Sequence, residues 1–258
     1  MTGHSVAVVV TSSTPLWYTT RATGLVALVL LTAGMCAGLL TSVRFERERL
    51  PRFVTQALHR NLSLIALAFT VLHVLTTVLD SFVSVSLIDV FIPFIGSYRP
   101  FWLGLGAVSF DLMLALIITS LLRARMSLRT WRLVHWSAYA CWPIAVVHGL
   151  GTGTDTPKSW VLALTVLCVL PVVVLTLRRL ALSWRERPGW AAAGVAGVVL
   201  AVVLGGVWLQ LGPLAPHWSK RAGTPPPNLP RPAAVSGRST APAGAHHDDG
   251  SGSSDADR

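Results

Sequence analysis

Six apolar stretches, each close to the roughly 20 residues that a helix needs to cross a bilayer, constrain the fold of this chain more than any other feature. They cover residues 22–42, 61–82, 100–122, 133–150, 160–177 and 190–211. Hydrophobic residues make up 52% of the 258 and charged residues only 12%, which excludes an ordinary soluble domain. We therefore predict an all-α fold, a polytopic membrane bundle of about six transmembrane helices in a lipid bilayer.

The basic residues lie in alternate loops between these stretches. Thirteen of the 21 Lys and Arg fall in three loops, at 43–60, 123–132 and 178–187. The positive-inside rule places these loops in the cytoplasm and both termini outside the cell, as in a multi-pass protein of a plasma membrane. Because the charge of +10 is divided among loops, we expect no nucleic-acid partner.

The two ends of the chain differ in composition from its centre. We expect an extracytoplasmic N-terminal segment at 1–21, a transmembrane domain at 22–211, and a disordered extracytoplasmic tail rich in Pro, Gly and Ser at 212–258. His246 and His247, near the end of the tail, fit a solvated polar terminus better than a metal site. The cysteines, Cys36, Cys141 and Cys168, form no CxxC pair, which argues against zinc, a disulfide framework or covalently attached haem.

Four histidines fall in or at the ends of only two apolar stretches. His59 and His73 are 14 residues apart, which is roughly 21 Å of helix with the two side chains about 40° apart around its axis. His135 and His148 are 13 residues apart, a similar depth, but on a straight helix their side chains lie about 140° apart. Pro143, between them, removes a backbone hydrogen bond and can bend the helix.

The alternation of loops makes the two histidine-bearing helices parallel, so His59 shares one depth with His135 and His73 shares another with His148. Imidazole is a suitable axial ligand for iron, and two of them leave no open position on it. We predict two non-covalent, bis-histidine haem b groups. The alternative is that the histidines are structural and form hydrogen bonds between helices.

The segments HRNLSLIALAFTVLH (59–73) and WRLVHWSAYACWPIAVVHG (131–149) resemble the haem-binding helices of the ferric reductase-like transmembrane family. This family includes ferric reductases, NADPH oxidases and the haem subunit of the periplasmic methionine sulfoxide reductase system. The resemblance covers about residues 22–180. It implies that His59 and His135 bind the cytoplasmic-side haem and that His73 and His148 bind the outer one.

The larger members of that family continue into a cytoplasmic domain that binds flavin and a nicotinamide. After residue 177 this sequence has no GxGxxG in a strand–turn–helix setting, so we expect no flavin or NAD(P) on this chain. A separate flavoprotein or a quinol would then donate the electrons.

Six further residues are secondary candidates. Arg60 and Arg132 beside the histidines, and Arg99 at the start of the third stretch, are candidates for haem propionates, with snorkelling to the membrane surface as the alternative. Trp142 and Phe69 could lie between the haems, although packing is the preferred role. Asp111 lies mid-membrane, where we expect a buried hydrogen bond rather than a proton relay.

Taken together, these residues favour an oxidoreductase component that moves electrons from a cytoplasmic or membrane donor to an extracytoplasmic acceptor. No residue is assigned as catalytic, because six-coordinate haems react by outer-sphere transfer. One alternative is a quinol-linked haem subunit of an extracytoplasmic reductase. Another, from a different class, is a non-redox membrane transporter or assembly factor, which would be colourless when purified.

Overall fold

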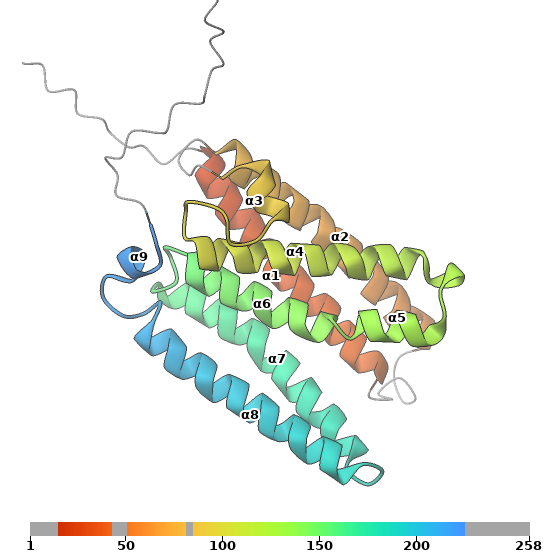
Figure 1. Ribbon diagram of the computed structural model, residues 1–258. Coiled ribbons are helices and arrows are strands. Elements are labelled where there is room, and N and C mark those ends of the chain that lie inside the picture. Colours follow the sequence, from red (N-terminus) through yellow and green to blue (C-terminus); the bar gives the residue numbers. More distant parts are fainter. Residues whose placement is uncertain (1–14, 43–50, 81–84, 225–258) are drawn as a thin grey trace, which may run out of the picture. The chain divides into compact units, whose positions relative to one another are not determined.

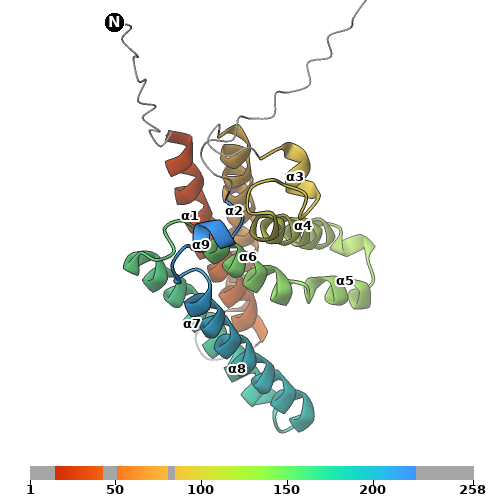
Figure 2. The same cartoon turned by 60° about the vertical axis from the view of Figure 1, so that its left-hand side comes forward.

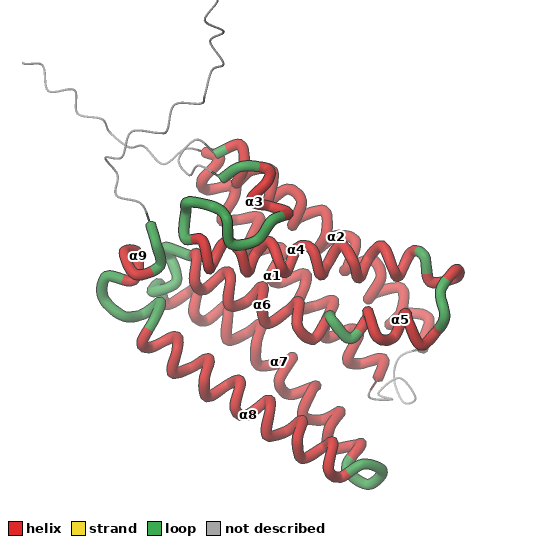
Figure 3. The backbone as a smooth tube through the Cα atoms, viewed as in Figure 1, coloured by secondary structure: helices red, strands yellow, loops and turns green. Residues whose placement is uncertain are grey.

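The computed structural model describes residues 15–42, 51–80 and 85–224, and every regular element in this part of the chain is helical (Figure 1; Figure 3). Two helices of intermediate length, α5 (Leu128–His135) and α6 (Ala138–Thr152), follow one another, and three short elements lie between or after the longer ones: α3 (Leu87–Phe91), η2 (Arg123–Arg125) and α9 (Trp218–Arg221). The long helices are α1 (Pro15–Ser42), α2 (Arg52–Leu79), α4 (Pro100–Leu121), α7 (Ser159–Ser183) and α8 (Pro188–Leu211).

Within the described residues, five helices are long and apolar enough to cross a membrane, namely α1, α2, α4, α7 and α8. Their most apolar windows have mean hydropathies between 2.1 and 2.7. The predicted class, a multi-pass bundle of membrane helices, is confirmed.

The fourth predicted span differs from the expectation. Instead of one helix over 133–150, α5 ends at His135 and α6 begins at Ala138, so the chain turns between the two histidines (Figure 3). The 15 residues of α6 extend about 22 Å, which is shorter than a typical membrane span.

Three helices extend beyond the predicted apolar stretches. α1 begins at Pro15, α2 follows Pro51, and α7 continues to Ser183. Proline fits the start of a helix because it lacks the N–H that the first turn leaves unpaired. Arginines within these helix ends can pack their apolar stems against the helix while their guanidinium groups reach the membrane surface. As a consequence His59 lies inside α2 rather than in the preceding loop.

The helices pack in pairs around two clusters of buried side chains. α1 lies along α2, α4 along α6, and α7 beside α8, as both ribbon views show (Figure 1; Figure 2). The first cluster joins α1, α6 and α7 through Leu39, Trp142, Val146, Leu150 and Val172. The second joins α3, α4 and α6 through Val90, Phe110, Met113 and Cys141.

Four buried threonines satisfy their hydroxyl groups within their own helices. Thr23, Thr32, Thr76 and Thr165 are buried, and each donates to the carbonyl oxygen four residues earlier, at 2.8 to 2.9 Å. A hydroxyl in hydrocarbon has no water partner, so these bonds remove a cost of burial.

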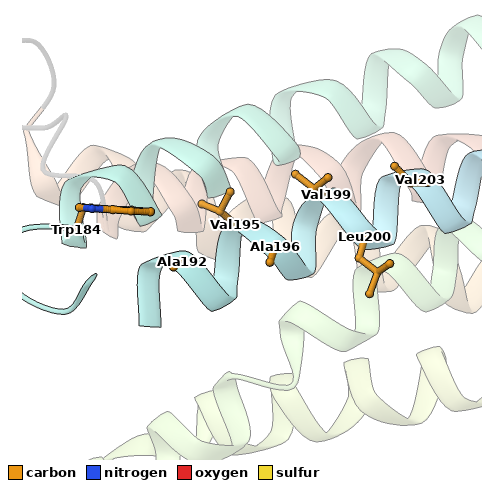
Figure 4. Close-up of a pocket in the computed structure, with 7 residues that line it drawn as sticks. All are labelled: Trp184, Ala192, Val195, Ala196, Val199, Leu200 and Val203. Carbon is orange, nitrogen blue, oxygen red and sulfur yellow. The ribbon is translucent and has the colours of Figure 1, made fainter. Parts of the chain in front are cut away.

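The outward side of α8 is exposed and apolar. A shallow groove of about 600 Å³ runs along it, with Trp184 at one end (Figure 4). The residues that line the groove carry apolar side chains, as expected for a surface that faces hydrocarbon.

Residues 212–224, which the sequence assigned to the tail, form α9 and close contacts with the ends of α4 and α6. Arg99 is 1% exposed, and its guanidinium donates to the carbonyls of Gly151 and Thr152 and to the hydroxyl of Thr224. Trp218 donates to the same Gly151 carbonyl. The predictions for residues 225–258, including His246 and His247, lie outside the described residues.

Replacing the buried guanidinium should loosen this end of the bundle. We expect Arg99→Met to lower the free energy of unfolding by about 3 kcal/mol, since several hydrogen bonds to a charged group disappear and their carbonyls lose a donor. Thermal unfolding in detergent measures the change, with Lys220→Met at an exposed position as the control. Equal melting temperatures for the two variants would contradict this role.

Candidate functional site

The four histidines form two pairs, one toward each end of α2. The ring centroids of His59 and His135 are 6.2 Å apart with an interplanar angle of 79°, and those of His73 and His148 are 6.5 Å apart at 76°. The earlier histidine of α2 meets the earlier histidine of α5–α6, and the later one meets the later one, so the two segments run in the same direction.

The turn between α5 and α6 gives a physical reason for a pairing that a straight helix would not allow. Around it the backbone forms bonds of the three-residue type, from Ser137 to Val134, Tyr139 to Trp136 and Ala140 to Ser137, at 2.9 to 3.0 Å. Such steps rotate the chain by about 120° rather than 100°, so three of them reduce the mismatch from about 140° to about 80°. Pro143 then lies one turn into α6.

Three of the four imidazoles are held from behind by the main chain of a neighbouring helix. The Nδ1 atoms of His59, His73 and His148 lie 2.8 Å from the carbonyl oxygens of Gly34, Thr20 and Trp102 respectively. A carbonyl only accepts, so each Nδ1 must carry the proton and Nε2 keeps its lone pair. This is the tautomer in which a histidine can bind a metal through Nε2.

His135 is held differently, by an aromatic ring. Trp131, one turn earlier on α5, stacks on it with centroids 4.7 Å apart and planes within 19°, and the Arg123 guanidinium lies 4.7 Å from the Trp131 ring centre. The Nδ1 of His135 is buried without a hydrogen-bond partner in the described part of the chain, as are the Trp131 indole nitrogen and the Ser137 hydroxyl.

The spacing within each pair fits a metal ion with one imidazole on each side. With metal–nitrogen bonds of about 2 Å and roughly 1 Å from the nitrogen to the ring centre, the two centroids would be about 6 Å apart. Among the described residues no three His, Cys, Asp or Glu side chains gather at one point. The pairs therefore suit a metal whose other ligands come from a cofactor.

The predicted propionate residues lie in contrasting environments. Arg60 on α2 and Arg132 on α5 are exposed, which leaves both side chains accessible. Arg99 is buried, and its donors meet main-chain carbonyls and Thr224. Their role toward propionates stays a prediction.

The three remaining candidates lie on three different helices. Trp142 is buried in the cluster of α1, α6 and α7, and its indole donates to Thr32 at 3.0 Å. Phe69 is half-buried on α2. Asp111 is half-buried on α4, and its hydrogen bond stays a prediction.

Sequence reasoning missed the groups that hold the imidazoles. The Trp131 side chain could have been found from its four-residue spacing to His135, which places both on one face of a helix. The backbone carbonyls carry no signal in residue type. An ion pair between Arg21 and Asp155 was also missed; Arg21 follows Thr20, whose carbonyl accepts from His73.

A comparison with known protein families identifies the family of this chain. The model of the family described as "ferric reductase like transmembrane component" matches residues 19–150, a range that includes all four paired histidines. Neither a curated protein nor a solved structure matches the chain. Domains of this family generally bind haem and are associated with electron transfer across membranes. The match extends over half of the sequence, and the chain belongs to the ferric reductase-like transmembrane family.

Proposed function

We propose that this protein carries electrons across a membrane through two b-type haems, one bound by His59 and His135 and the other by His73 and His148. The observation that carries the proposal is the pair of facing imidazoles at each end of α2, with centroids 6.2 and 6.5 Å apart. Haem supplies a one-electron couple, Fe(III)/Fe(II), and the four equatorial nitrogens that the protein side chains do not provide.

The protein fixes the two axial ligands and their protonation state. Hydrogen bonds from Nδ1 to the carbonyls of Gly34, Thr20 and Trp102 orient three rings. Because a neutral imidazole carries one proton and these bonds hold it on Nδ1, the Nε2 atom keeps its lone pair. With two histidines on each iron, no position on the metal would remain for oxygen or substrate, and electrons would reach the acceptor by outer-sphere transfer.

The two pairs provide one site near each membrane surface. His59 and His73 are separated by 14 residues of continuous helix, roughly 21 Å along its axis. We assign the His59–His135 site to the cytoplasmic side, because Arg60, Arg123 and Arg132 lie at that end. The donor would be a flavoprotein or a quinol, and the acceptor would be extracytoplasmic.

Each axial ligand should be necessary for one haem. We expect His59→Ala and His73→Ala each to reduce the haem content of the purified protein from about two to about one per chain, because a single imidazole cannot retain the group in a detergent micelle. A pyridine haemochrome assay measures the content. His217→Ala, at the N-cap of α9, is the matched control and should keep both haems.

The haem content of the variants can also contradict the assignment of the ligands. If His73→Ala retained the full complement of haem, the assignment of His73 as a ligand would be wrong. A wild-type protein that stays colourless when haem is supplied during expression would instead support the transporter or assembly-factor alternative.

Transfer across the bilayer should need both sites. Liposomes that contain the protein and enclose ferricyanide should lose ferricyanide absorbance after dithionite is added outside, at a rate at least tenfold above protein-free liposomes. In His59→Ala or His73→Ala the rate should fall to the protein-free level, since either loss breaks the path. Undiminished transfer in both variants would rule out a path through the two sites.

A further inference from the structure

Each of the three imidazoles that form a hydrogen bond to a main-chain carbonyl also contacts a glycine, four residues after the residue that supplies the carbonyl. His73 meets Thr20 and Gly24, His59 meets Gly34 and Gly38, and His148 meets Trp102 and Gly106. On α1 the two glycines are 14 residues apart, the same spacing as the two histidines on the antiparallel α2.

A methyl group on any of these glycines would press against the ring. A Cβ built on Gly106 would lie 2.4 Å from the His148 ring, one on Gly24 would lie 3.0 Å from the His73 ring, and one on Gly38 would lie 3.3 Å from the His59 ring. At Gly106 an alanine would have to displace the imidazole, because real side chains do not approach this closely, whereas at Gly24 and Gly38 the ring would have to move by a few tenths of an ångström.

The spacing has a physical cause. In an α-helix the carbonyl of residue i already accepts from the N–H of residue i+4, and a second donor must approach past the side chain at i+4. When that residue is glycine, the ring can lie in the gap and reach the carbonyl oxygen. The helix thus supplies an acceptor to a neighbouring imidazole without losing its own hydrogen bond.

The fourth imidazole has no such place. On α4, Ala115 and Thr119 lie 13 residues after Trp102 and Gly106, the same separation as between His135 and His148. The hydroxyl of Thr119 donates to the Ala115 carbonyl at 2.6 Å, so both the gap and the acceptor are taken. This agrees with the unpartnered Nδ1 of His135.

We infer that Gly24, Gly38 and Gly106 are positioning residues, which let three imidazole ligands form hydrogen bonds to main-chain carbonyls. The His59–His135 site then has one such bond, and the His73–His148 site has two. The inference rests on the proposed function. Donation from Nδ1 makes an imidazole a stronger ligand and stabilises Fe(III). Loss of one bond therefore raises the midpoint potential of the haem concerned.

The test is a series of glycine-to-alanine variants of the full-length protein, in detergent, with two controls. Gly197→Ala, on α8, adds a Cβ with nothing within 4 Å of it. Gly149→Ala stands next to His148 with nothing within 4 Å. Redox titration of each haem and the EPR g-values of the low-spin Fe(III) signals are measured together with haem content.

We expect the effects to follow the contacts. Gly106→Ala should shift the potential and the g-values of one haem most or cause its loss, Gly24→Ala should affect the same haem less, and Gly38→Ala should affect only the other haem. Both controls should match the wild type. If Gly106→Ala does not fold, Gly24→Ala and Gly38→Ala, with milder contacts, carry the test.

The outcomes separate the two proposals. If the wild type binds two haems and all three variants show the same potentials and g-values as the wild type, the positioning role is wrong and the proposed function stands. Wild-type protein without haem would overturn the proposed function and, with it, this inference.

Discussion

The hydrogen bond from an imidazole Nδ1 to a main-chain carbonyl of the next helix is the interaction on which the rest of this structure depends. In hydrocarbon an unpaired imidazole N–H is costly, so it finds an acceptor in protein. Three such bonds, each 2.8 Å long, join α2 to α1 and α6 to α4. They join two of the helix pairs that lie side by side, and they leave the opposite nitrogen of each ring available.

The same bonds explain why glycine occurs at three positions of α1 and α4, whereas the break between α5 and α6 lies at the imidazole that makes no such bond. Gly24, Gly38 and Gly106 bring the backbone of one helix within reach of a ring on the next. At the remaining imidazole α5 ends and the chain turns into α6, which brings His135 opposite His59. Stacking of Trp131 on His135 takes the place of a carbonyl there.

Much of this arrangement could be predicted from the sequence, because helix periodicity and hydropathy are local properties. The apolar stretches predicted the long helices, and the parallel direction of two of them grouped His59 with His135 and His73 with His148. The turn at Trp136 and Ser137 could not be predicted, since neither residue type terminates a helix. The buried contacts of Arg99 were also hidden, because its partners are main-chain carbonyls and Thr224 from a segment whose composition indicated a tail.

The central claim is that the paired imidazoles bind two haems, and an optical spectrum of the purified protein tests it most directly. Oxidised and dithionite-reduced spectra, with a haemochrome count, should show two b-type haems per chain, both six-coordinate and low-spin. Protein that remains colourless after expression with sufficient haem would contradict the account, and one haem per chain would contradict the assignment of two equivalent pairs.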